Sequence, residues 1–284
     1  MIKILRIPQW LKNIVIVLPA IFSNDIKSIL NFNFLIYFFV ISMVISSTYI
    51  INDVKDADQD RLHPEKQDRP IASGSMSVRF AIFYSLTLLI IGLSFIFLTN
   101  VTLFNFLIFY ILLTFSYSFK LKYVKFLDFI SISLLFGIRL FLGSTLTSTN
   151  LSSYIIIFLI MFLTQLGIGK KVSIYYDVNI DPNTKLKFHL MRKYRESELK
   201  RLLLFFIFGS NWGLFLWGYE KFNINKSVGI YVVLVLVLFN LFSKNFYLDS
   251  LKSKTENFIN WVFLLKNFIY LSVMFIFILK IIYF

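Results

Sequence analysis

Residues 32–60 read FNFLIYFFVISMVISSTYII and then NDVKDADQD, an apolar run that ends in a cluster of carboxylates. The apolar part, 32–51, is long enough to cross a membrane as a helix. Asp53, Asp56 and Asp60 follow with the spacing i, i+3, i+7, which places them on one face if the helix continues. Carboxylates on one face repel each other unless a cation joins them, and Mg²⁺ prefers such oxygen ligands. The stretch therefore predicts a membrane helix with a magnesium site at its end, suited to a phosphorylated substrate.

The composition indicates that the whole chain is a membrane protein. Of the 284 residues, 58% are hydrophobic and only 15% are charged, and the mean hydropathy is +0.75. A soluble domain of this size needs more polar surface. Cysteine is absent, which excludes disulfides and thiolate metal sites. Residues 1–10 lack a small-residue cleavage site, so they are predicted to form an amphipathic helix rather than a removable signal.

Nine apolar runs predict an all-α, polytopic fold with about nine transmembrane helices in one integral membrane domain, 1–284. The runs cover 11–29, 32–51, 78–98, 101–119, 126–147, 153–174, 202–218, 227–243 and 262–284. Pro19 interrupts the first, which makes it the weakest. A second acidic pair, Asp177 and Asp181, follows the sixth run as the first cluster follows the second. This indicates a pseudo-repeat of 1–125 and 126–245, followed by a ninth helix at 262–284.

The distribution of Lys and Arg predicts the orientation in the membrane. With the N-terminus in the cytoplasm, the predicted outer segments contain only Lys27, Lys221 and Lys226 of the 29 basic residues. Nearly all the others fall on the cytoplasmic side, as the positive-inside rule requires. The net charge of +14 is then mostly this bias, and no nucleic-acid partner is predicted. Both acidic clusters lie on the same side, so the active site is expected on the cytoplasmic side of the cell membrane.

The loop after the first cluster contains further candidates for phosphate contacts. His63-Pro64-Glu65-Lys66 and Arg69-Pro70-Ile71-Ala72-Ser73-Gly74 combine basic side chains with rigid turn residues. A solvated loop is the simpler interpretation, but it does not explain why basic side chains and carboxylates at helical spacing occur together. The sequence favours Lys66 and Arg69 as ligands of a diphosphate and His63 as a turn residue.

Other basic residues have two interpretations each. Lys12, next to Trp10, either anchors an interfacial helix or meets a phosphate, with Gln9 and Asn13 placed to orient ribose hydroxyls. Lys122 either marks the cytoplasmic side or contacts a phosphate. Arg139 lies inside an apolar run, where a charge is costly, so it is predicted to face a cavity and bind a phosphate or an acidic side chain.

Asn52-Asp53-x-x-Asp56-x-x-x-Asp60 together with Arg69-Pro70 resembles the first signature of the UbiA superfamily of intramembrane prenyltransferases. The resemblance extends over nearly the whole chain in span count and motif placement. It implies helices around a central cavity open to lipid, with a Mg²⁺-diphosphate substrate bound at the acidic clusters. Asp53, Asp56 and Asp60 are then catalytic metal ligands, and Asp177 and Asp181 are candidates for further metal contacts.

Within that superfamily the chain is similar to the decaprenyl-phosphate phosphoribosyltransferases. The similarity lies in Arg6-x-x-Gln9-Trp10-x-Lys12-Asn13, in Tyr117-Ser118-x-x-Leu121-Lys122 with Asp128 and Arg139, and in Gly169-Lys170-Lys171. It implies transfer of 5-phosphoribose from phosphoribosyl pyrophosphate to a polyprenyl phosphate, for cell-envelope glycan synthesis. The implied substrate contacts are Gln9, Lys12, Asn13, Asn52, Lys66, Arg69, Tyr117, Lys122, Arg139, Lys170 and Lys171.

Two alternatives remain open at this point. Asp177-Val178-Asn179-Ile180-Asp181 has the Asp-x-x-x-Asp form of aromatic prenyltransferases, in which an isoprenyl diphosphate is the donor. A non-enzymatic lipid carrier or transporter would also need many spans, but it does not explain the convergence of carboxylates and basic residues. In either enzyme the bilayer is a partner and Mg²⁺ the expected cofactor, and the chain is compatible with a homo-oligomer.

Overall fold

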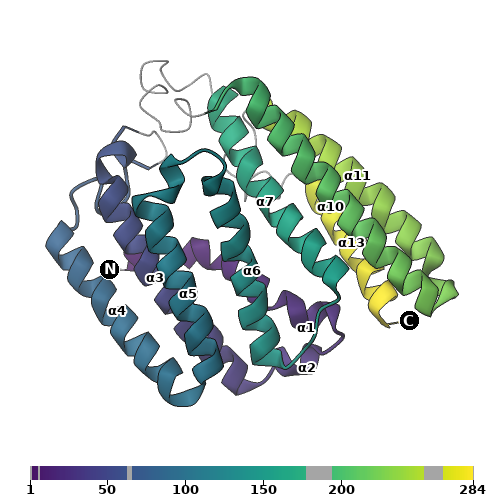
Figure 1. The fold of residues 1–284 in the computed structure, drawn as a ribbon, viewed down its shortest axis with the longest axis horizontal. Coiled ribbons are helices and arrows are strands. Elements are labelled where there is room, and N and C mark those ends of the chain that lie inside the picture. Colours follow the sequence, from purple (N-terminus) through teal and green to yellow (C-terminus); the bar gives the residue numbers. More distant parts are fainter. Residues whose placement is uncertain (1, 6, 63–65, 177–193, 253–264, 284) are drawn as a thin grey trace. The chain divides into compact units, whose positions relative to one another are not determined.

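The computed structural model describes residues 2–5, 7–62, 66–176, 194–252 and 265–283, and every regular element among them is a helix (Figure 1). Seven of these helices are long and apolar enough to cross a membrane. Of the described residues, those up to Asn150 form one compact unit and those from Leu151 onward form a second. The all-α, polytopic prediction is therefore confirmed, while the predicted repeat of 1–125 and 126–245 stays a prediction.

The first unit begins with short helices and continues with four long ones. The short helices are η1 (Ile2–Leu5), η2 (Ile7–Ile16), α1 (Leu18–Phe22) and α2 (Ile26–Ile29). The long ones are α3 (Phe32–Asp60), α4 (Val78–Thr99), α5 (Val101–Phe119) and α6 (Leu127–Thr147), with η3 (Leu121–Tyr123) before α6. Helix α3 packs against α4 and α5, and α6 packs against α5 and η2.

The first apolar run differs from its prediction as a single span over 11–29. The structure divides it into η2, α1 and α2. Pro19 lies in the first turn of α1, where its missing N–H costs nothing, and the residues before it cannot continue the helix. Asn24, with a φ of 59°, follows α1 in the left-handed conformation. The chain therefore reaches α3 through short helical pieces.

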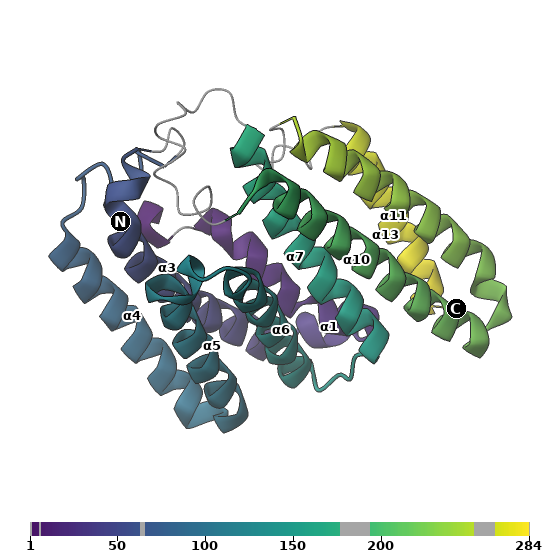
Figure 2. The same ribbon diagram turned by 45° about the horizontal axis from the view of Figure 1, so that its top comes forward.

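The second unit contains α7 (Ser153–Tyr176), α10 (Glu196–Ile224), η4 (Lys226–Val228), α11 (Gly229–Ser250) and α13 (Leu265–Tyr283). Helix α7 packs most extensively on α10, and α11 packs on α13 (Figure 2). Helix α10 extends beyond the run predicted at 202–218 at both ends, and α11 extends beyond the run predicted at 227–243 at its C-terminal end. Polar residues at their ends continue the helix after the apolar window stops, so hydropathy alone underestimates their length.

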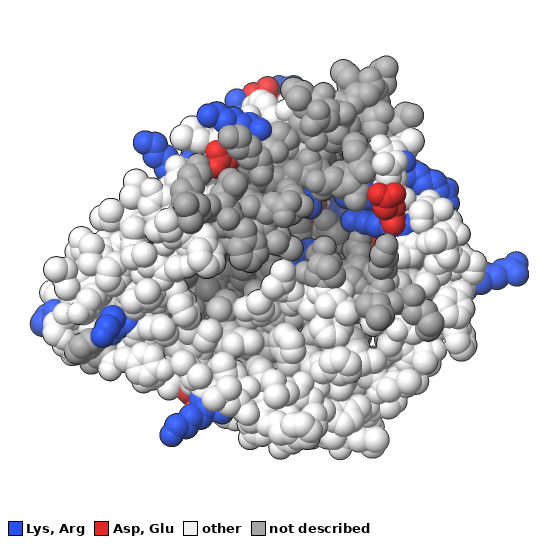
Figure 3. All heavy atoms as spheres, turned by 180° about the vertical axis from the view of Figure 1, so that it is seen from behind, with Lys and Arg blue, Asp and Glu red and all other residues white. Residues whose placement is uncertain are grey.

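Large apolar side chains cover the outside of both units, as expected of surfaces that contact lipid. Phe83, Ile90 and Leu112 are exposed in the first unit, and Phe208 and Trp212 are exposed in the second. Figure 3 shows one face on which charged side chains are sparse over a wide area. These exposed residues agree with a multi-pass membrane protein and need no protein partner to explain them.

Two helical glycines differ in how closely a neighbouring segment approaches them. A Cβ built on Gly143 of α6 would overlap the backbone carbonyl of Ile16, so α6 and η2 can approach this closely only without a side chain there. A Cβ on Gly209 of α10 would instead meet the sulfur of Met161 at 3.2 Å, and a flexible methionine can move away.

We predict that Gly143→Ala destabilises the protein by about 1–3 kcal/mol, because the backbone of η2 must shift to admit the methyl group. Gly209→Ala is the matched control and should cost clearly less. Thermal unfolding of the purified protein in detergent, followed by loss of the monodisperse size-exclusion peak, measures both. Equal midpoints for Gly143→Ala and the parent would contradict the close approach of α6 and η2.

Candidate functional site

The three carboxylates of the first cluster lie on the last turns of α3, which continues without interruption from the apolar run. Residues seven apart are almost superposed on a helix, whereas a residue three positions on is rotated by about 60°. The structure follows this geometry. Asp53 and Asp60 are each only 4% exposed and turn toward one group, while Asp56 is half-buried and turns toward another.

Arg69 joins Asp53 to Asp60. Its Nη1 lies 3.2 Å from Oδ1 of Asp53 and 2.5 Å from Oδ2 of Asp60. Lys66 Nζ lies 4.0 Å from the second oxygen of Asp60. The turn that follows is closed by backbone hydrogen bonds from Ser73 to Arg69 and from Met76 to Pro70. The loop therefore places two cations on the carboxylate face of α3, and their predicted contact with a diphosphate stays a prediction.

Asp56 belongs to a second set of contacts that connects α3 to α5 and η3. Its carboxylate accepts a hydrogen bond from the Lys122 ammonium and another, at 3.0 Å, from Nδ2 of Asn52. The Asn52 amide oxygen in turn accepts a hydrogen bond from Ser118 of α5 at 2.9 Å. Both polar atoms of the Asn52 amide are thus hydrogen-bonded. The Lys122 side chain is held against the acidic cluster rather than extended into solvent.

The donor set fits a hard divalent cation. Two carboxylates two turns apart already converge on one positively charged nitrogen, and carboxylate and amide oxygens are the ligands Mg²⁺ takes. Within the described residues, no three acidic or imidazole groups lie close enough together to form a complete metal cage. Magnesium binding by Asp53, Asp56 and Asp60 would therefore require Arg69 or Lys122 to move aside, and this binding stays a prediction.

Arg139 and Asn13 lie deeper in the first unit, where they contact each other. Arg139 Nε donates to Oδ1 of Asn13 at 3.3 Å, and Nη2 donates to the hydroxyls of Tyr49 at 2.8 Å and Tyr110 at 2.5 Å. Asn13 Nδ2 donates to Ser42 of α3 at 2.9 Å. Both residues are buried. The predicted contact of Arg139 with a phosphate stays a prediction.

The remaining candidates are distributed between the two units. Lys12 is exposed on η2, with its Nζ 5.9 Å from the centroid of the Tyr49 ring. Tyr117 is half-buried on α5, one residue before Ser118. Lys170 and Lys171 lie toward the end of α7 in the second unit. The side chain of Gln9, and Arg6, His63, Asp177 and Asp181, lie outside the described residues, so their predicted roles stay predictions.

Four polar residues of this region were not found from the sequence. Tyr49 lies four residues before Asp53, so helical spacing could have revealed it as a neighbour of the cluster. Ser42 and Ser46 recur at the same four-residue spacing on α3, and both accept hydrogen bonds from η2. Tyr110 lies in the middle of an apolar run, and nothing in the sequence links it to Arg139.

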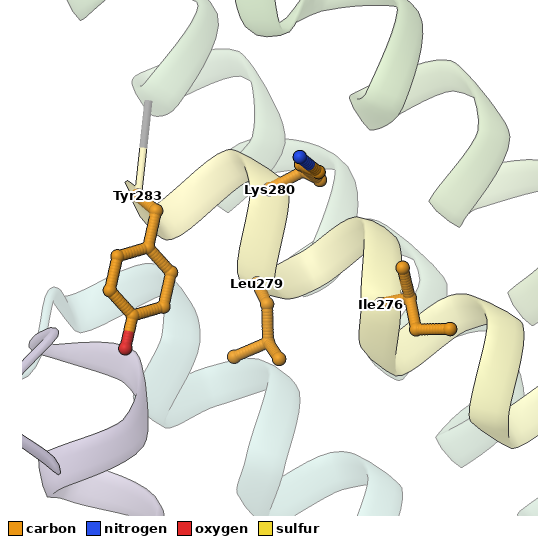
Figure 4. A pocket seen from close by; sticks show the side chains of 4 residues that line it. All are labelled: Ile276, Leu279, Lys280 and Tyr283. Carbon is orange, nitrogen blue, oxygen red and sulfur yellow. The ribbon is translucent and has the colours of Figure 1, made fainter.

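The depression lined by α13 does not contribute to this site. Its volume is about 490 Å³ and its lining residues are Ile276, Leu279, Lys280 and Tyr283 (Figure 4). Those side chains are mostly apolar and include no acidic or metal-ligating group. None of the predicted site residues lies on α13.

The family assignment comes from comparison with known proteins. The sequence matches the UbiA prenyltransferase family over residues 14–281. The chain belongs to this family. Its fold agrees, because a solved UbiA homologue from Archaeoglobus fulgidus, bound to DMAPP and Mg²⁺, superimposes with a TM-score of 0.64. That structure is 16% identical, and the match covers 99% of this chain and 98% of the homologue.

Two curated relatives are more similar in sequence. An uncharacterized protein of Sinorhizobium fredii is 34% identical over 170 residues, 59% of this chain and 33% of that protein. A decaprenyl-phosphate phosphoribosyltransferase of Corynebacterium glutamicum is 32% identical over 211 residues, 72% of this chain and 61% of the enzyme. The chain thus spans about a third of the first protein and less than two thirds of the second.

Arg69 is predicted to be the residue on which the acidic cluster depends. Arg69→Gln leaves Asp53 and Asp60 buried, close together and without their shared guanidinium, which should destabilise the protein by about 1–3 kcal/mol. Arg61→Gln is the control, because Arg61 pairs with the exposed Asp58. Thermal unfolding with and without Mg²⁺ provides the test. Added Mg²⁺ should raise the midpoint of Arg69→Gln more than that of Arg61→Gln, and an equal response would argue against a metal at these carboxylates.

Proposed function

We propose that this UbiA-family protein transfers 5-phosphoribose from phosphoribosyl pyrophosphate to a polyprenyl phosphate and releases pyrophosphate. The observation that carries the proposal is the arrangement at the end of α3, where Asp53, Asp56 and Asp60 meet Lys66, Arg69 and Lys122. Acidic and basic groups at one membrane-helix end suit a substrate that brings its own phosphates and cation. The similarity to the Corynebacterium glutamicum enzyme supports this donor and acceptor.

In the proposed reaction the protein acts by positioning and by electrostatic stabilisation. Asp53, Asp56 and Asp60 would hold Mg²⁺, which when bound neutralises the charge of a diphosphate. Arg69, Lys66 and Lys122 exchange their carboxylate partners for phosphate oxygens as the donor enters. The bond between the anomeric carbon and the pyrophosphate oxygen breaks, and a bond from that carbon to a phosphate oxygen of the lipid forms. That oxygen is already anionic, so no strong general base is needed.

The membrane setting follows from the same proposal. The polyprenyl chain lies among apolar helices, and its phosphate reaches the end of α3. The abundance of Lys and Arg in the segments on that side favours a cytoplasmic N-terminus and a cytoplasmic active site in the cell membrane. The product would then serve cell-envelope glycan synthesis. Lys170 and Lys171 are proposed as further phosphate contacts, and Asp177 and Asp181 as further metal contacts.

A second candidate is transfer of an isoprenyl group. The solved Archaeoglobus fulgidus homologue is bound to DMAPP, an isoprenyl diphosphate, together with Mg²⁺. In such a reaction the same carboxylates would bind the diphosphate of the lipid, and an aromatic acceptor would attack the allylic carbon. The lipid is then the donor instead of the acceptor, which makes the two reactions experimentally distinct. A lipid carrier, the third alternative, would turn over neither substrate.

A paired assay separates these functions. Purified protein with Mg²⁺ should consume phosphoribosyl pyrophosphate and release pyrophosphate only when polyprenyl phosphate is present. Removal of Mg²⁺ with a chelator should stop the reaction. Activity with an isoprenyl diphosphate and an aromatic acid, and none with the first pair, would instead establish the second candidate. No turnover with either pair, from protein that remains monodisperse, would favour the carrier.

Replacement of single carboxylates tests the site independently of the substrate. Asp53→Asn and Asp56→Asn should each lower turnover by at least about a hundredfold, because each removes a charge that the reaction requires. Asp58→Asn is the matched control on the same turns of α3, where Asp58 is exposed and pairs with Arg61. Its turnover should equal that of the parent. If the Asp53 and Asp58 variants behave alike, the acidic face of α3 is not the reaction site.

A further inference from the structure

Arg139 is a buried cation whose hydrogen-bond partners come from three other segments. Its side chain is on α6, its residue is only 3% exposed, and it contacts Asn13 of η2, Tyr49 of α3 and Tyr110 of α5. Its Nη1 donates to the carbonyl of Leu135 on its own helix at 3.3 Å. The structure records no carboxylate within ion-pair distance of Arg139 anywhere in its described part.

This set of partners indicates a role in holding segments together. A guanidinium inside a membrane protein is costly unless its donors are satisfied, and here neutral hydroxyl, amide and carbonyl oxygens accept four hydrogen bonds from it. The planar guanidinium can bond several acceptors in fixed directions, which a lysine ammonium cannot reproduce. A phosphate bound directly by Arg139 would have to displace one of these internal bonds.

Arg139 is one of several groups that hold η2 in place. Asn13 bridges Arg139 and Ser42, and Trp10 Nε1 donates to Ser46 at 2.8 Å. The close approach of Ile16 to Gly143 completes the docking of η2 on α3 and α6. Without the Arg139–Asn13 bond, the buried Asn13 amide oxygen would lose its described partner.

Lys12 connects this docking to the acidic cluster. It is the neighbour of Asn13, and its ammonium lies over the ring of Tyr49, whose hydroxyl accepts a hydrogen bond from Arg139. Tyr49 precedes Asp53 by four residues, which is about one helical turn of α3. Arg139 thus contacts Asn13, which is adjacent to Lys12 in sequence, and Tyr49, whose ring lies beneath the Lys12 ammonium.

We propose that Arg139 is a positioning residue that holds η2 against α3 and α6, so that the Lys12 ammonium stays over the Tyr49 ring, where it can bind a substrate phosphate. The docking part of this proposal stands on the contacts alone. The phosphate part rests on the proposed function. Arg139 itself does not touch the substrate, so it acts through Asn13, Tyr49 and Lys12.

Because the chain contains no cysteine, a single introduced thiol can report on the docking of η2. Val15 is buried on η2, so Val15→Cys should react slowly with a water-soluble maleimide in detergent-purified protein. In this background Arg139→Gln should raise the labelling rate by at least about tenfold, because several bonds to a charged group are lost. Arg139→Lys should raise the labelling rate almost as much, since an ammonium cannot reproduce the several directed N–H donors of the guanidinium. An unchanged rate in Arg139→Gln would overturn the proposal.

Two controls separate release of η2 from general unfolding. Ser131→Ala removes a buried hydroxyl of α6 that bonds only within its own helix, and should leave the labelling rate at position 15 unchanged. The thiol of a Ser243→Cys protein, buried on α11 in the second unit, should stay protected when Arg139→Gln is added. If the thiol at position 243 also becomes reactive, the labelling experiment at position 15 is repeated with Asn13→Ala and with Tyr49→Phe in place of Arg139→Gln. Failure of both to accelerate labelling at position 15 would then overturn the proposal.

Kinetics test the connection to Lys12. Lys12→Gln and Arg139→Gln should each raise the KM of the same phosphate-bearing substrate by about tenfold, more than they lower kcat, because both affect binding through one ammonium. The double variant should be no worse than the worse single variant. Additive losses would show that Arg139 does not act through Lys12. If labelling accelerates but no phosphoribosyl transfer is found in any variant, the docking role stands and the proposed function fails.

Discussion

The structure of the first unit depends on how carboxylates are neutralised at the end of a membrane helix. A buried, unpaired Asp is costly, and three uncompensated carboxylates would destabilise the packing of the end of α3 against its neighbours. Arg69 and Lys122 remove that cost from two directions, because helical rotation separates Asp56 from the pair formed by Asp53 and Asp60. The loop after α3 and the connection between α5 and α6 are therefore fixed by the charges that they bring to α3.

The same contacts explain how the resting protein and the proposed reaction are related. The cations that neutralise the cluster are the groups that would contact substrate phosphates, so a donor with bound Mg²⁺ would exchange one set of ion pairs for another. Such an exchange leaves the total number of compensated charges nearly constant. It also makes donor binding depend on the loop of Arg69 and on η3, neither of which belongs to a spanning helix.

Sequence reasoning predicts this protein best where one periodicity governs a long segment. The span at 32–51 and its continuation through Asp60 follow from apolar length and from spacing of three and seven residues. The sequence identifies Arg69 and Lys122 as candidates for phosphate contacts, whereas the contact of Lys122 with Asp56, 66 residues away, follows only from the fold. The break of the first run at Pro19 is visible, but its resolution into three short helices is not. The partners of Arg139 could not be predicted, because Tyr49 and Tyr110 meet only through the packing of α3, α5 and α6.

Helix α3 has 29 residues, so at 1.5 Å per residue it is about 44 Å long, whereas the hydrocarbon core of a bilayer is about 30 Å thick. At the average tilt of about 20°, the helix exceeds this thickness by roughly two turns. The acidic residues occupy those final turns, which puts them at the depth of the phospholipid headgroups. A lipid whose phosphate lies at headgroup depth could react there with a water-soluble substrate while its apolar chain stays in the bilayer.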